Sequence, residues 1–134
     1  MKNKPLLVAL VLWLSAGFIG HEINAKRNQR IYLSKPIPCY SSEAGLLKDA
    51  ETEKRKLGLE NITIEFVESP NIEGGHSIKA ENKFKITFNP RHKNRLVLRH
   101  ELYHIKTWSN TSLIDFLTMG NYNEYNATSY SIMD

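Results

Sequence analysis

The sequence predicts an α+β domain that is preceded by a hydrophobic N-terminal helix. Three observations lead to this: an apolar run near the N-terminus, three short strand patterns within residues 61–89, and helical patterns on both sides of the strands. The chain has 134 residues, 41% hydrophobic and 24% charged, so it can form one domain with a modest core. This composition argues against wholesale disorder.

The N-terminal segment is expected to be a membrane anchor or a signal peptide. Lys2 and Lys4 precede an apolar run, residues 6–19, that is too hydrophobic on all sides for a surface helix. The run is short for a span of about 20 apolar residues and fits the core of a signal peptide. The plausible cleavage site near Ala25 is poor, because Ile23 stands where a small residue is needed. An uncleaved single-pass anchor is therefore favoured over a signal peptide whose removal would give a secreted or periplasmic protein.

A linker is expected between the anchor and the folded domain. Pro36 and Pro38 predict an extended arm there, and the single cysteine of the chain, Cys39, is read as an unpaired loop thiol. One cysteine also excludes an intramolecular disulfide framework. The predicted organisation is an anchor or signal peptide at 1–27, a linker at 28–41 and a folded domain at 42–134.

The folded domain is expected to begin with a helix in SSEAGLLKDAETEKRKLGLE. Ser41 or Ser42 can cap this helix, and Gly58 can end it. The apolar residues on one side of it are Leu46, Leu47, Ala50 and Leu57.

Three strands and three helices should follow. NITIEFVES alternates apolar and polar residues, and HSIKA and KFKITFN predict a hairpin that turns at EN. Pro90 then stops the sheet, and a helix is expected from about Arg91 to Trp108. A short apolar helix in SLIDFLT ends at Gly120, and NYNEYNATSYSIMD predicts a closing helix.

The helix after Pro90 carries two neighbouring stripes. Leu98, Leu102 and Ile105 recur at helical spacing and should face the core. The adjacent stripe contains His100 and His104, one turn apart and pointing the same way. A metal site needs this position at the edge of a buried face. The whole stripe is Val97, His100, His104 and Trp108, with Glu101 beside it.

The spacing His-Glu-x-x-His predicts a zinc centre that hydrolyses peptide bonds. Residues i and i+4 of a helix can place two imidazole nitrogens on one Zn²⁺ ion, as His100 and His104 would. Glu101 is turned so that its carboxylate can reach a zinc-activated water as the general base. The same carboxylate can pass the proton to the leaving amine.

The third ligand is expected downstream of the histidine pair. No histidine follows His104, so the remaining ligands are the carboxylates of Asp115, Glu124 and Asp134. Asp134 ends the chain, where fraying is expected. Glu124 is favoured over Asp115, because Ala127 would let the closing helix pack closely against the histidine helix, and two histidines with one glutamate form a catalytic zinc set.

HELYH followed by NEYNA resembles the gluzincin zinc peptidases, which include thermolysin-like enzymes and minimal single-domain forms. The resemblance covers residues 42–134 and implies a zincin-like minimal domain, with zinc bound by His100, His104 and Glu124. It also implies that an edge strand beside the histidine helix, KFKITFN, pairs with extended substrate. The sequence departs from the family at Thr128, where many relatives place an aspartate that braces a zinc-binding histidine. Support for that histidine is therefore expected from elsewhere.

Two alternatives to a peptidase stay open. One is a catalytically degenerate, metal-binding interaction module, which the small size and Thr128 suggest. The other is a nucleic-acid-associated protein, which the net charge of +4 and the run RHKNR suggest. No stacking aromatics are interleaved with that run, so nucleic acid is disfavoured. The expected partners are a protein or peptide substrate and a membrane, and the oligomeric state is left open.

Overall fold

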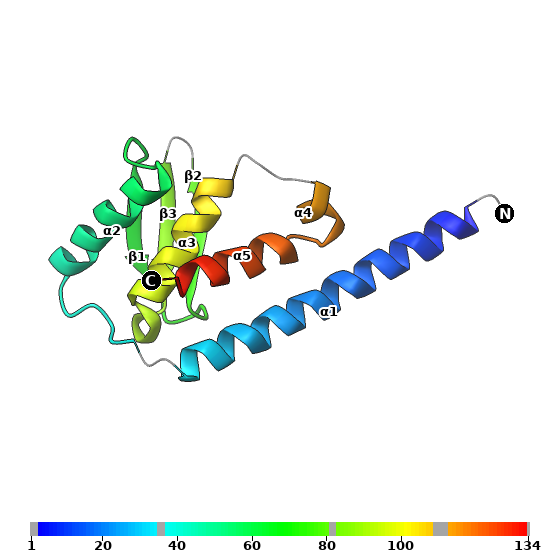
Figure 1. Ribbon diagram of the computed structural model, residues 1–134, viewed down its shortest axis with the longest axis horizontal. Helices are drawn as coiled ribbons and strands as arrows, with labels where there is room; N and C mark the ends of the chain where they lie inside the picture. The colour runs from blue at the N-terminus through cyan, green and yellow to red at the C-terminus, as the bar shows by residue number, and fades with distance from the viewer. Residues whose placement is uncertain (1–2, 35–36, 81–82, 109–112, 134) are drawn as a thin grey trace. The chain divides into compact units, whose positions relative to one another are not determined.

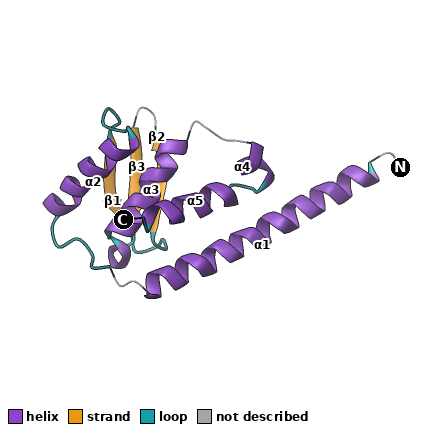
Figure 2. Ribbon diagram, viewed as in Figure 1, coloured by secondary structure: helices purple, strands orange, loops and turns teal. Residues whose placement is uncertain are grey.

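The computed structural model describes residues 3–34, 37–80, 83–108 and 113–133. These residues form five α-helices and one three-stranded sheet (Figure 2), so the prediction of an α+β fold after an apolar N-terminal helix is confirmed. The order of the elements (Figure 1) is α1 (Lys4–Ser34), α2 (Glu43–Leu57), β1 (Ile64–Glu68), β2 (Gly75–Ala80), β3 (Lys83–Phe88), a 3-10 turn (Pro90–His92), α3 (Arg95–Thr107), α4 (Leu113–Leu117) and α5 (Asn121–Ser131).

The contacts divide the chain into two compact units. The helical unit comprises the described residues within 1–36 and 110–126, which are α1, α4 and the first half of α5. The sheet unit comprises the described residues within 37–109 and 127–134, which include α2, the sheet, α3 and the second half of α5. Helix α5 is continuous across the boundary between residues 126 and 127.

The sheet has the strand order β1-β3-β2. Strand β3 pairs in parallel with β1, with Ile64 opposite Phe84, and antiparallel with β2, with Gly75 opposite Phe88. The predicted hairpin is confirmed in its two strands, and its EN turn lies outside the described residues. The expectation that KFKITFN forms an edge strand is wrong, because β1 occupies the side of β3 away from the hairpin. The edge strand next to α3 is β2.

Helix α3 packs on the sheet through its apolar stripe. Leu98 and Leu102 are fully buried, as the sequence predicts, and burial of each leucine stabilises the fold by about 1.5–3 kcal/mol. The helix begins at Arg95, later than expected, because residues after Pro90 form a 3-10 turn. Asn94 then caps α3, since its Oδ1 accepts a hydrogen bond from the Val97 N–H at 3.1 Å.

Helix α2 has the predicted ends. Ser42 Oγ accepts a hydrogen bond from the Gly45 N–H at 3.1 Å, and Gly58 ends the helix in the left-handed conformation with φ 72°. Leu47 is exposed, so its expected place on the core side is wrong. The buried stripe continues from Leu46 through Ala50 to Leu57, and it also includes the charged residues Glu53 and Lys54.

Helix α1 is longer than the sequence predicts. It continues to Ser34, so the expected extended arm is wrong for residues 28–34, while the domain limits at 27 and 41 stay a prediction. Its segment Lys4–Ile31 is long and apolar enough to cross a membrane, with a mean hydropathy of 1.9 in its most apolar window. A signal sequence near the N-terminus meets the same criterion.

Candidate metal centre

Helix α3 brings the two predicted histidines together. His100 and His104 are one turn apart, and their Nε2 atoms lie 3.1 Å from each other. His100 is buried at 6% exposure, and His104 is half-buried. The stripe beside the core therefore presents two imidazoles from one helix face, at the edge of the buried region.

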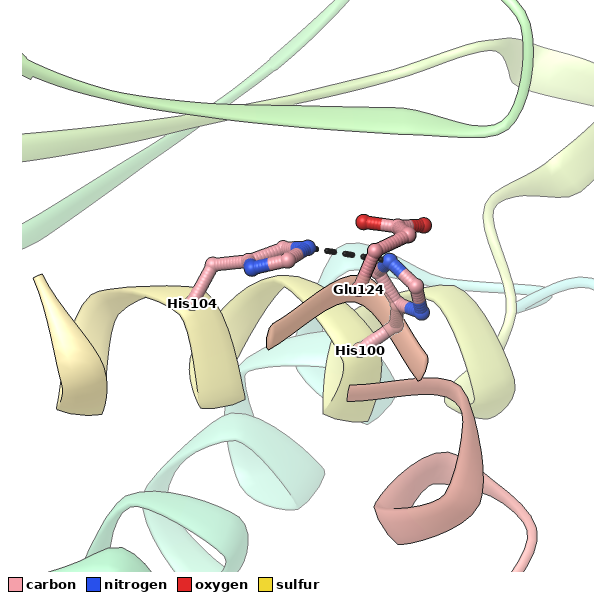
Figure 3. Close-up of side chains that lie close together, drawn as sticks. All are labelled: His100, His104 and Glu124. Carbon is pink, nitrogen blue, oxygen red and sulfur yellow. Dashed lines mark hydrogen bonds between the residues drawn. The ribbon is translucent and has the colours of Figure 1, made fainter. Parts of the chain in front are cut away.

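Glu124 on α5 completes a group of three side chains that could hold a metal ion. The ligand atoms of His100, His104 and Glu124 all lie within 4.8 Å of one another. Figure 3 shows the glutamate carboxylate close to the two imidazole rings of α3. The favoured third ligand of the sequence prediction is thus the one that the structure groups with the histidine pair.

The distances and the donor types suit a zinc ion. With Zn–N bonds of about 2.05 Å and tetrahedral angles, two imidazole nitrogens on one ion lie about 3.3 Å apart. The observed 3.1 Å between the two Nε2 atoms is close to that value, although it also suits an imidazole–imidazole hydrogen bond. Two imidazoles and a carboxylate are the protein donors of one class of catalytic zinc site. The residues present therefore fit the metal that the sequence predicts.

Thr128 supports His100 from one turn further along α5. Its Oγ1 lies 3.3 Å from His100 Nδ1, and the side chain is buried. When Nδ1 carries the proton and donates it to the hydroxyl, Nε2 presents a lone pair to a metal. The expectation that support for the histidine comes from elsewhere is therefore wrong. Thr128 itself makes the contact.

Helix α1 supplies a second polar contact to the proposed ligands. Within the helical unit, Asn28 Nδ2 donates a hydrogen bond to Glu124 Oε1 at 3.2 Å. An amide that holds one carboxylate oxygen restricts the rotation of the carboxylate. The helix that the sequence marks as an anchor thus also orients a residue of the candidate centre.

The side chain of Glu101, on α3, lies next to Gly75, the first residue of the edge strand β2. It is buried at 5% exposure, and a methyl group added to Gly75 would lie 3.2 Å from its Oε1 and 2.5 Å from Val97 Cγ1. A side chain at position 75 would therefore crowd the glutamate. The absence of one lets the backbone of β2 come close to the proposed base.

A buried ion pair between α2 and α3 accepts and donates hydrogen bonds that hold the second half of α5 within the sheet unit. Arg99 Nε lies 3.0 Å from Glu53 Oε1, with side-chain exposures of 7% and 4%. An Arg99 N–H also donates to the Met133 carbonyl, and the Tyr130 hydroxyl donates to Glu53 Oε2 at 3.3 Å. Burial and then the Glu53 carboxylate raise the pKa of Tyr130, so its hydroxyl keeps its proton at neutral pH. These contacts hold the helix that carries Thr128.

Other residues considered from the sequence take no part in this group. Asp115 lies on α4 and is not among the three grouped side chains, and Asp134 lies outside the described residues. The Cys39 thiol is exposed and donates to the Arg91 carbonyl at 3.3 Å.

Sequence reasoning overlooked several contributors that leave faint signals. Glu53 occupies a core position of the α2 stripe, where an apolar residue is expected. Asn28 falls in a polar continuation of the apolar helix, and Gly75 stands just before the predicted strand HSIKA. Each gains its role from a partner that is distant in the sequence.

Comparison of the chain with protein-family models, with curated protein sequences and with solved structures found no match. Its function is therefore inferred from its own residues and their geometry.

Proposed function

We propose that this chain is a membrane-anchored zinc endopeptidase of the gluzincin type. The observation that carries the proposal is the convergence of His100, His104 and Glu124, two imidazoles and a carboxylate whose ligand atoms lie within 4.8 Å of one another. Zinc bound to these side chains would supply a Lewis acid that lowers the pKa of water to about 7.

Glu101 is the proposed general base. It follows His100 directly on α3, and its buried carboxylate lies next to the start of β2. It takes a proton from the attacking water and delivers it to the nitrogen of the leaving amine, so one carboxylate serves both half-steps. Burial excludes bulk water from the carboxylate and so preserves its interaction with the reacting groups.

Strand β2 is the proposed docking edge for an extended substrate peptide. One of its edges pairs with β3, and within the described part of the chain no strand pairs with the other. Backbone pairing along such an edge gives affinity with little dependence on side chains. The strand begins at Gly75 beside Glu101, so a peptide on this edge would run past the base.

The contacts of α1 support an uncleaved anchor. Asn24 Nδ2 donates to the Asn121 carbonyl at 3.0 Å, and Asn28 bonds Glu124. A helix that is bonded to α5 on both sides of Ala25 is part of the folded unit. Cleavage near Ala25 would remove the first of these contacts.

No specific observation favours either of the two alternative functions. The contact between Thr128 and His100 removes the main reason to expect a degenerate metal-binding module. In the basic run RHKNR, Lys93 Nζ forms an ion pair with Glu68 at 2.7 Å, which reduces the charge available to a nucleic acid.

The proposal is tested by replacing the base while leaving the ligands in place. For the full chain in detergent micelles, we expect about one zinc per chain and cleavage of an unfolded protein such as casein. Glu101→Gln should retain the zinc and lower the cleavage rate by about 10²- to 10⁴-fold, because proton transfer is lost.

The matched control is Glu60→Gln, which removes an exposed glutamate outside the site and should leave both quantities unchanged. Wild-type cleavage by the Glu101→Gln variant would overturn the mechanism. Stoichiometric zinc without cleavage by the wild-type chain would favour the metal-binding module.

A further inference from the structure

We propose that helix α4 inserts into the same bilayer as α1, with its outward-facing side chains in contact with lipid acyl chains. The proposal rests on the membrane anchoring proposed above. It concerns only the helical unit, in which α1, α4 and the first half of α5 contact one another.

Helix α4 exposes its apolar residues and turns its charged residue inward. Leu113 is 72% exposed and Phe116 is 60% exposed, and Ile114 and Leu117 are also exposed. Asp115, the one charged residue of the helix, is half-buried. A helix that faces water has the opposite arrangement, so the outer face of α4 suits an apolar environment.

Helix α4 contacts the middle of the apolar run of α1. The rings of Trp13 and Phe116 are stacked with their centroids 5.4 Å apart, and Trp13 Nε1 donates to the Phe116 carbonyl at 3.1 Å. Trp13 lies near the centre of the apolar stretch 6–19. If this stretch lies in hydrocarbon, α4 lies beside it at the same depth.

The turn between α4 and α5 satisfies its own backbone donors, as a bilayer requires. All five consecutive N–H groups from Thr118 to Tyr122 donate within the turn. Their acceptors are the Ile114 carbonyl at 3.0 Å, the Phe116 carbonyl at 3.2 Å, the Asp115 carbonyl at 2.7 Å, the Thr118 carbonyl at 3.0 Å and Thr118 Oγ1 at 3.1 Å. This stretch can therefore leave water without leaving those N–H groups unbonded.

Two glycines let the turn approach α1 closely. A methyl group added to Gly17 would lie 2.0 Å from Met119 Sδ, and one added to Gly20 would lie 2.7 Å from Asn121 Nδ2. Asn121 Nδ2 also donates to the Gly17 carbonyl at 2.8 Å. Small residues at the contact and interhelical bonds of this kind are typical of helix packing in membranes.

Lipid is favoured over a second copy of the chain as the occupant of this face. The face of α4 is joined through Trp13 and Phe116 to α1, whose own apolar residues from Leu6 to Leu12 are largely exposed. After the apolar run, exposed Lys26 and Arg30 are placed to meet anionic headgroups. A bilayer accounts for both helices at once.

Spin labels measure the depth of each position directly. In a Cys39→Ser background, single cysteines replace Ile114 and Leu117 on α4, Leu10 on α1 and Glu60 in the sheet unit. The full chain is placed in phosphatidylcholine–phosphatidylglycerol vesicles, and collision rates with oxygen and with a water-soluble nickel complex are compared. We expect labels at 114 and 117 to match position 10, with high oxygen and low nickel accessibility, and position 60 to show the reverse.

The outcomes separate this proposal from the anchoring on which it rests. Labels at 114 and 117 that behave like position 60, while position 10 is lipid-exposed, would overturn the insertion of α4 and leave the anchor intact. Low accessibility to both reagents at 114 and 117 would mean that protein covers α4, which also overturns it. If position 10 itself behaved like position 60, the anchor would fail and the insertion of α4 with it.

Discussion

At the scale of residues, Thr128 is placed to support one of the proposed metal ligands. Its hydroxyl lies 3.3 Å from His100 Nδ1. A neutral hydroxyl can fix the orientation and tautomer of the imidazole. It adds no negative charge, so His100 should be a weaker ligand than one braced by aspartate.

Replacing Thr128 should therefore lower or raise the zinc affinity, depending on whether the new side chain can accept a hydrogen bond from His100. Thr128→Val keeps the shape but removes the acceptor, and we expect zinc affinity to fall by about 10- to 100-fold. Thr128→Asp should raise the affinity above that of the wild-type chain. Competition with a fluorescent zinc chelator measures both, and Thr52→Val on the exposed side of α2 is the control. Equal affinities in all four proteins would show that Thr128 does not support the ligand.

Part of the candidate site could be read from local spacing. His100, Glu101 and His104 follow from helical periodicity alone, because positions four apart share a helix face. The roles of Thr128 and Gly75 could not be read in this way. Each depends on a partner about 25 residues away, and such contacts are set by tertiary packing.

At the scale of elements, α1 is a packing helix as well as an apolar one. The prolines near residue 36 suggested that a linker starts at residue 28, but side chains on one stripe of α1 bond to α4 and α5 and the helix continues to Ser34. The stripe is visible in the sequence at spacings of three or four: Trp13, Gly17, Gly20, Asn24 and Asn28.

Removing the Asn28 amide should weaken zinc binding without touching a ligand. In Asn28→Ala the Glu124 carboxylate loses a hydrogen bond, and we expect zinc affinity to fall by about tenfold or more. Isothermal titration of the metal-free full chain measures the change. The neighbouring Gln29→Ala alters an exposed residue of the same helix and should bind zinc like the wild type. An Asn28→Ala variant with unchanged affinity would contradict the positioning role of α1.

The buried ion pair between Glu53 on α2 and Arg99 on α3 should contribute more to stability than the exposed ion pair between Glu53 and Lys56. Arg99→Met would leave Glu53 buried without its main partner, and we expect a loss of about 3–5 kcal/mol in the free energy of unfolding. Lys56→Met removes a 53% exposed side chain whose Nζ lies 3.3 Å from the same carboxylate, and should cost less than about 1 kcal/mol. Urea denaturation of the full chain compares the two. Equal losses in the free energy of unfolding of the two variants would contradict the role of Arg99 as the main partner of Glu53.

At the scale of the whole molecule, the element order was predictable and the strand order was not. Alternating residues and turn signals predicted three strands, and apolar stripes and capping residues predicted the helices around them. That β3 lies between β1 and β2 depends on pairing between segments about 20 residues apart, such as Ile64 with Phe84. The edge strand was therefore assigned to the wrong segment.

The candidate centre likewise depends on the whole molecule. Its histidines come from one helix and its carboxylate from another, and the contacts that hold the second helix come from Glu53, Arg99 and Asn28. A helical His-Glu-x-x-His pattern without these contacts would provide two ligands only. The presence of a third ligand distinguishes a metal centre from a pair of surface histidines.

The most direct test of the account is the zinc content of the purified full chain beside two carboxylate variants. Inductively coupled plasma mass spectrometry should find about one zinc per chain in the wild type. Asp115→Ala, which removes the other downstream carboxylate considered, should retain the metal, and Glu124→Ala should lose most of it. Undiminished zinc in Glu124→Ala, or none in the wild type, would contradict the proposed centre.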